Sequence, residues 1–112
     1  MNIQQAGLIL MTGLSYMDGK MDESEMEKIA EFAAQNLSAD VDTAKAIFKM
    51  MSDASGEDTI KSMLVAGAYI GAKASTESKT TMLKFLLELA EADGEVHANE
   101  IAVISQLKEA WL

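Results

Sequence analysis

The chain carries one acidic motif twice, first as Asp18-Gly19-Lys20-Met21-Asp22-Glu23-Ser24-Glu25-Met26 and again as Asp93-Gly94-Glu95-Val96-His97-Ala98-Asn99-Glu100-Ile101. Both copies fit the pattern Asp-Gly-x-apolar-x-x-x-Glu-apolar. The match extends further along the chain, because Ile29 corresponds to Ile104 and Phe32 to Leu107. In each copy the Asp-Gly pair is typical of a turn, and the residues after it are typical of a helix start. An internal repeat of this kind predicts two similar halves packed into one unit.

Composition predicts that this unit is all-α. The 112 residues contain no proline, and the sequence is rich in Ala, Leu, Met, Glu and Lys, which are good helix formers. Long helices are therefore not interrupted from inside. A chain of this length is typical of one domain with a hydrophobic core. We expect a single domain over residues 1–112, folded as a compact bundle of about six to seven helices from two pseudo-symmetric halves.

Apolar spacing and turn signals place the main helices at about residues 3–16, 22–37, 40–54, 58–72, 76–91 and 98–112. The apolar stripe of the third helix includes Val41. The run 63–72 in the fourth helix is apolar on all sides, which predicts a central, buried helix. Gly7 and Gly13 in the first helix leave room for a neighbouring helix to approach closely. Trp111 fits either packing on the bundle or contact with a partner.

Net charge limits the classes of partner. The formal net charge is -9. Nucleic acid and anionic membrane surfaces are not expected as partners, because both are bound through clustered Lys and Arg. Cations and basic protein partners are favoured. The chain has no cysteine, which excludes disulfides, thiolate metal sites and Cys nucleophiles and suits the cytoplasm.

The first 17 residues carry no charged side chain. They are not typical of a signal peptide, because the positive start is missing and Gln4 and Gln5 interrupt the apolar run. They are also too short and too rich in glycine for a membrane span. We therefore expect a buried first helix and no direct insertion into a membrane.

Each motif resembles the second half of a calcium-binding helix-loop-helix loop. Asp18 and Gly19 fall on loop positions five and six, and Glu25 falls on position twelve. The front half is missing, because Leu14 and Tyr16 occupy positions one and three. One Asp and one Glu supply too few oxygens for a hard cation that prefers six or more. Neither copy alone is therefore expected to bind calcium well.

The second copy offers a way to complete the site. Asp93 and Glu100 match Asp18 and Glu25 position by position. If the two turns meet across a pseudo-two-fold axis, these four carboxylates share one site, and binding of a divalent cation becomes feasible.

The same residues also fit helix capping. Asp22 and Glu25 form a capping-box-like pair at a helix start, and His97 and Glu100 occupy the equivalent positions. His97 also falls on loop position nine and Glu91 on position three. These two residues and Asp22 are therefore weaker candidate ligands. The sequence leaves both interpretations open, cation binding and capping.

The doubled motif, which closes one helix and opens the next, resembles the TerB tellurite-resistance family. It is also similar to the membrane-proximal domain of DjlA-type co-chaperones. The resemblance covers about residues 8–112 and includes Val41-Asp42-Thr43-Ala44 and the apolar fourth helix. It implies an all-helical domain of two pseudo-symmetric halves with an acidic, cation-binding site at Asp18, Glu25, Asp93 and Glu100. The chain differs from the family in having Met17 where Ala is usual and in ending soon after the last helix.

Two classes of function follow. The first is a non-enzymatic, cytoplasmic domain in tellurite or metal stress, which binds a divalent cation or a partner protein at the acidic turns, for example in a membrane-associated stress complex. The alternative is a metal-independent protein–protein interaction module, a co-chaperone-like scaffold that docks through the same turns. A metal-dependent hydrolase is disfavoured, because it needs an open coordination position and a base, and the chain has no pair of histidines. A serine-based catalytic triad is also disfavoured, because no G-x-S-x-G motif is present.

Overall fold

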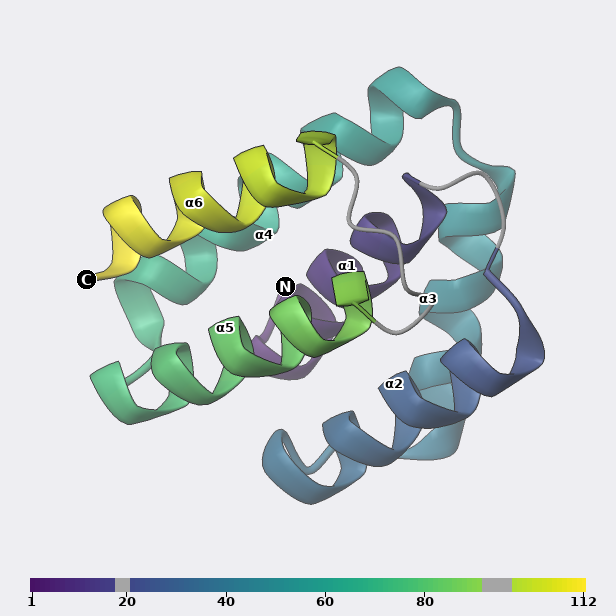
Figure 1. Ribbon diagram of the computed structural model, residues 1–112. Coiled ribbons are helices and arrows are strands. Elements are labelled where there is room, and N and C mark those ends of the chain that lie inside the picture. The colour runs from purple at the N-terminus through teal and green to yellow at the C-terminus, as the bar shows by residue number, and fades with distance from the viewer. Residues whose placement is uncertain (18–20, 92–97) are drawn as a thin grey trace.

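A computed structural model describes residues 1–17, 21–91 and 98–112 (Figure 1). These residues form six helices and no strand, which confirms the expected all-α fold. The helices are α1 (Ile3–Tyr16), α2 (Glu23–Asn36), α3 (Val41–Asp53), α4 (Gly56–Lys73), α5 (Thr76–Glu91) and α6 (Ala98–Trp111).

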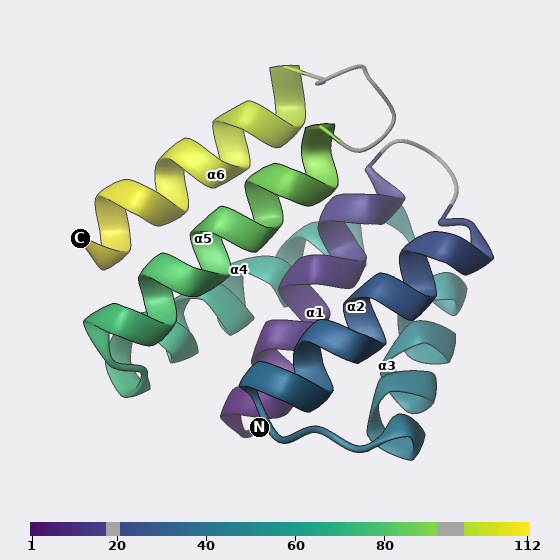
Figure 2. The ribbon, with the colours of Figure 1, turned by 60° about the horizontal axis from the view of Figure 1, so that its bottom comes forward.

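Helix α1 is the centre of the bundle. Every residue from 6 to 15 is buried, and α1 packs against α2, α3, α4 and α5. Figure 2 shows α1 between α2 and α5, with α4 on its other side. A helix that is apolar on all sides is stable in water only when other helices cover it on all sides. The expectation of a buried first helix is thus confirmed.

The expectation that the fourth helix is central is wrong. One face of α4 packs on α1, with Met63, Ala66 and Ile70 buried. The other face points outward, and Ile60 and Leu64 are each more than half exposed. The central position belongs to α1, so the apolar run of α4 leaves one side uncovered. Val41 is also exposed rather than part of the core.

Close approach to α1 depends on Gly13, as expected. A Cβ atom at Gly13 would lie 2.5 Å from the Met63 sulfur and 2.6 Å from its Cγ. Real Cβ atoms do not approach neighbours so closely, because van der Waals repulsion is steep at that distance. The glycine therefore lets α4 lie directly against α1.

Helix starts are set by local caps. Asp22 precedes α2 and accepts a hydrogen bond from the Glu25 N–H at 2.8 Å, and Asp40 precedes α3 and accepts one from the Thr43 N–H at 2.7 Å. These bonds satisfy N–H groups that lack partners in the first turn. The bonds from Thr43 hold the pKa of Asp40 below its usual value. Ser55 caps α4 in the same way, so α4 begins at Gly56, two residues before the expected start.

Candidate functional site at the acidic end of the bundle

Four helix ends gather at one end of the bundle. Helix α1 packs against α5, and α5 packs against α6. In Figure 2, α1 and α5 run in the same direction, so their carboxyl ends lie at the same end as the amino ends of α2 and α6. These are the helices that the two acidic motifs join. Of the predicted site residues, Asp18, Asp93 and His97 lie outside the described residues.

Glu25 is held in the first turn of α2. The residue is partly buried, and its N–H donates to Asp22 Oδ1. Asp22 itself is exposed and has its carboxylate engaged in this cap. The local geometry therefore gives Asp22 a structural role that needs no metal, which is the capping predicted from the sequence.

Glu100 occupies the equivalent position in the first turn of α6 and is almost fully buried, with 1% of its surface exposed. A buried carboxylate is costly unless hydrogen bonds or a positive charge compensate it. Both Glu25 and Glu100 interact with other groups of the protein. A negative charge at the amino end of a helix is also favoured by the helix dipole. The sequence predicted Glu100 as a ligand but did not predict its burial.

The described residues do not complete a metal site by themselves. Within residues 1–17, 21–91 and 98–112, no three His, Asp or Glu side chains lie close enough to hold one ion. Glu91, at the end of α5, is exposed. The other candidate ligands, Asp18, Asp93 and His97, lie outside these residues.

Apolar contacts fix the helices behind this end. Met21, on the motif position that anchors the turn, is buried, as is Ile29. Phe32 of α2 stacks on Phe85 of α5, with ring centroids 4.1 Å apart and planes 18° apart. Such a stack adds to the packing energy of the two helices. The second anchor, Val96, lies outside the described residues.

Two hydroxyl groups on α1 were not singled out by the sequence. Thr12 and Ser15 are buried, and among the described residues neither side-chain oxygen has a hydrogen-bond partner. Ser15 lies in the last turn of α1, next to the acidic end. Spacing along a helix gives no sign of such burial, because it results from enclosure of α1 by four other helices.

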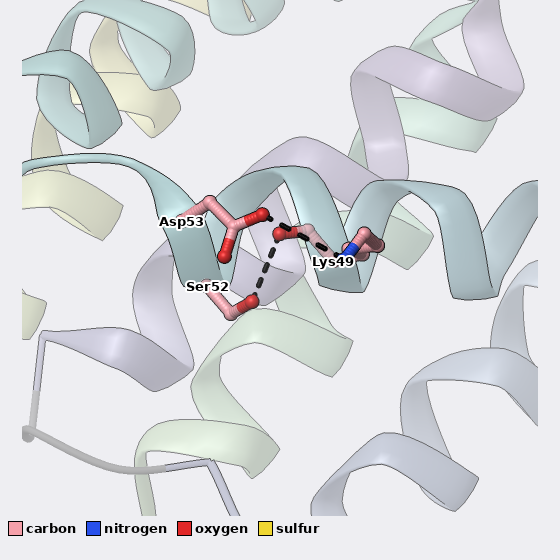
Figure 3. A network of polar contacts seen from close by, with 3 residues as sticks. All are labelled: Lys49, Ser52 and Asp53. Atoms are coloured by element: carbon pink, nitrogen blue, oxygen red, sulfur yellow. Dashed lines mark hydrogen bonds and ion pairs between the residues drawn. The ribbon is translucent and has the colours of Figure 1, made fainter.

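Polar contacts on α3 are hydrogen bonds and ion pairs between exposed residues of the same helix. On α3, Lys49 Nζ lies 4.0 Å from Asp53 Oδ2, and the Ser52 hydroxyl donates to the Lys49 carbonyl at 2.8 Å (Figure 3). Both members of the ion pair are strongly exposed. Exposed pairs of this type contribute little to stability, so they do not indicate a functional site.

Trp111 is packed rather than free. The indole is buried, and its Nε1–H donates to the Gly67 carbonyl at 2.9 Å. This bond joins the end of α6 to the middle of α4. Of the two roles that the sequence left open for Trp111, the structure shows packing on the bundle.

None of the helices in the part of the chain that the structure describes is long and apolar enough to cross a membrane.

The described residues form an all-helical bundle in which the helices that flank the two acidic motifs end or begin at the same end of the bundle. The family model described as tellurite resistance protein TerB matches residues 4–111, nearly the whole chain. The chain belongs to the TerB family. No curated protein and no solved structure matched it significantly.

Proposed function

We propose that this TerB domain is a non-enzymatic module that binds a divalent cation where its two acidic turns meet, in the context of a tellurite or metal stress response. The ligands are the carboxylates of Asp18, Glu25, Asp93 and Glu100. The observation that carries the proposal is the burial of Glu100 at the end of the bundle where α1, α2, α5 and α6 converge. Carboxylate oxygens are the ligands that hard divalent cations prefer.

The arrangement of the helices supports a shared site rather than two separate ones. Glu25 and Glu100 occupy matching first-turn positions on two helices whose amino ends lie at the same end of the bundle. Each turn alone offers too few oxygens, whereas four carboxylates approach the number that a hard cation needs once water completes the shell. A cation there also lowers the repulsion among acidic groups in a chain of net charge -9.

Thermal unfolding tests this function. A cation that binds only the folded state at one hundred times its Kd stabilises the fold by about 2.7 kcal/mol. For a domain of this size the melting temperature then rises by roughly 10 °C relative to protein in EDTA. Calcium, magnesium, manganese and zinc are compared one by one, and calorimetric titration gives the stoichiometry, which is expected to be one ion per chain.

Two variants separate the shared site from general charge effects. Asp18→Asn combined with Asp93→Asn removes two charged ligands and is expected to abolish the cation-dependent shift while the helical circular dichroism remains. Asp53→Asn, an exposed carboxylate on α3, is the matched control and is expected to retain the shift. If Asp18→Asn alone leaves the affinity unchanged, the ion is not shared between the turns.

No shift with any of the four ions refutes the proposal. The metal-independent docking module is then the better interpretation.

A further inference from the structure

A groove of about 560 Å³ runs along the contact between α4 and α6 on the outside of the bundle. Among the described residues that line it, none is charged and Gln106 is the one polar side chain. Its walls and floor include Ile60, Leu64, Gly67, Gly71, Val103 and Leu107. Ile60 and Leu64 are more than half exposed, so the groove continues into an open apolar ridge. Contiguous apolar surface of this kind is typical of an interaction site.

The two helices that form the groove run in the same direction. Gly67 lies against Leu107, and Gly71 lies against Trp111. Figure 1 shows α6 alongside α4 in this orientation. From Ile60 to Gly71 the groove extends for about 16 Å, which is three turns of helix. A groove of this length accommodates three turns of one further helix.

Charges at the two ends of α4 have opposite sign. Glu57 and Asp58 lie in its first turn, where Glu57 pairs with Lys61, and Lys73 lies in its last turn. The last turn of α6 adds no net charge, because Lys108 is followed by Glu109. Helix α4 as a whole carries two acidic and two basic residues, so it has no net charge. A helix that docks antiparallel to α4, with acidic residues first and basic residues last, matches this pattern at both ends.

We propose that the occupant is helix α4 of a second copy of this chain, in a two-fold symmetric dimer. Helix α4 has the required charge order, because Glu57 and Asp58 come first and Lys73 comes last. When two α4 helices lie antiparallel, the acidic turn of each faces the basic end of the other. Each α4 then fills the groove of its partner. Helices α4 and α6 of the two copies form a four-helix bundle, in which the pair from one copy runs opposite to the pair from the other.

Shape favours the same arrangement. A two-fold interface requires the inserting surface and the receiving surface to lie on one face of the molecule. The ridge formed by Ile60 and Leu64 borders the groove, so both surfaces are present on one face. Ala68 is exposed on this face and carries only a methyl group, which lets a second backbone approach closely.

The required area is also available. A standard interface buries about 800 Å² per partner, which is about one-eighth of the 6399 Å² exposed by this chain. Like-charge repulsion is low here, since α4 is neutral although the chain as a whole is not.

Sedimentation velocity over a range of protein concentrations, combined with light scattering, tests the dimer. The unmodified chain is expected to form a dimer that dissociates on dilution. Leu64→Glu, at a residue 65% exposed, places a charge in the contact and is expected to weaken the dimer at least about tenfold. Val41→Glu is the matched control, because Val41 is 59% exposed on α3, and it is expected to leave the dimer unchanged.

Cross-linking tests the orientation, since the chain has no cysteine of its own. Ala68→Cys, near the middle of α4, is expected to cross-link to its own copy through a short bismaleimide. Lys73→Cys is expected to cross-link with Asp58→Cys in a mixed sample and not with itself.

A chain that stays monomeric at millimolar concentration overturns the proposal, as does a dimer that resists Leu64→Glu. Self-linking of Lys73→Cys indicates parallel helices and also overturns it. If the monomer instead binds a basic amphipathic peptide or a fatty acid in competition with a groove-binding dye, the occupant is a different molecule and the assignment is wrong.

Discussion

Gly13→Ala tests the packing at the centre of the fold. The added Cβ would lie 2.5 Å from the Met63 sulfur and 2.6 Å from its Cγ. These atoms are close to the Met63 backbone and Met63 is buried, so the side chain has little freedom to move away. We expect α4 to shift outward or Met63 to adopt an unfavourable rotamer.

Two terms decide the size of the effect. Overpacking of a core contact costs about 1–3 kcal/mol. Replacing glycine by alanine inside a helix restores about 1 kcal/mol, because the unfolded chain loses conformational freedom and helix propensity rises. Gly56→Ala is the matched control, since a Cβ there meets no atom within 4 Å. That change is expected to stabilise the fold by roughly 0.4–1 kcal/mol. The free energies of unfolding of the two variants should therefore differ by about 1–3 kcal/mol, and Gly13→Ala should be the less stable variant.

Urea unfolding followed by circular dichroism measures both free energies of unfolding. A double-mutant cycle with Met63→Ala then identifies the clash. Met63→Ala alone should cost about 2–5 kcal/mol because it leaves a cavity, and it should cost at least about 1 kcal/mol less in the Gly13→Ala background. If Gly13→Ala stabilises the protein as much as Gly56→Ala does, α1 and α4 are not in the close contact described.

The remaining predictions concern helix ends. Trp111→Phe removes the indole hydrogen bond to α4 and part of the buried volume, which should cost about 1–2 kcal/mol and lower the melting temperature by roughly 4–8 °C. Asp22→Ala should lower the free energy of unfolding by about 1 kcal/mol, equally in EDTA and in excess cation. Asp22→Asn should retain most of the stability. A loss of stability that occurs only in the cation-loaded protein would show that Asp22 is a ligand rather than a cap. The pKa of Asp40 is lowered in the fold, so its capping contribution is complete above the unfolded-state pKa and is lost as pH falls below about 4. Acid unfolding monitored by circular dichroism should therefore show a weaker dependence on pH in this range for Asp40→Asn, and an unchanged dependence would contradict the capping role.

Much of the fold could be predicted from the sequence because its signals are local. Asp22 and Asp40 are caps whose bonds reach three residues along the chain, and the structure places them one residue before α2 and α3. The start of α4 was predicted two residues late, because Ser55 acts as the cap and the glycine after it adopts helical geometry. Glycine is a poor helix former, but the Ser55 hydroxyl accepts a hydrogen bond from the Asp58 N–H and so sets the helix start at Gly56.

Which apolar helix is central could not be predicted from hydropathy alone. Both α1 and the run 63–72 lack charges over about ten residues, and each fits a buried helix. The structure encloses α1 and leaves Leu64 exposed. The choice depends on which helix the others pack around, and this is a tertiary property that spacing does not encode. Burial of Glu100 and of the Trp111 indole also depends on contacts between distant segments.

Cation binding and self-association should be separable, because the charge of the chain is unevenly distributed. Residues 22–36 contain five acidic residues and one lysine, whereas α4 is neutral. Interactions between exposed charges are screened beyond about 8 Å at physiological ionic strength. None of the groove's lining residues is a candidate ligand, although Met17 precedes Asp18 directly in the sequence, so we expect a cation to have little influence on the outer face of α4. We expect the dimer dissociation constant measured by sedimentation to be the same in EDTA and in saturating cation, and Leu64→Glu to leave the cation-dependent thermal shift intact. A dimer that forms only with cation would place the second copy at the acidic end instead of the groove, since only there does the ion change the charge that each chain presents to the other.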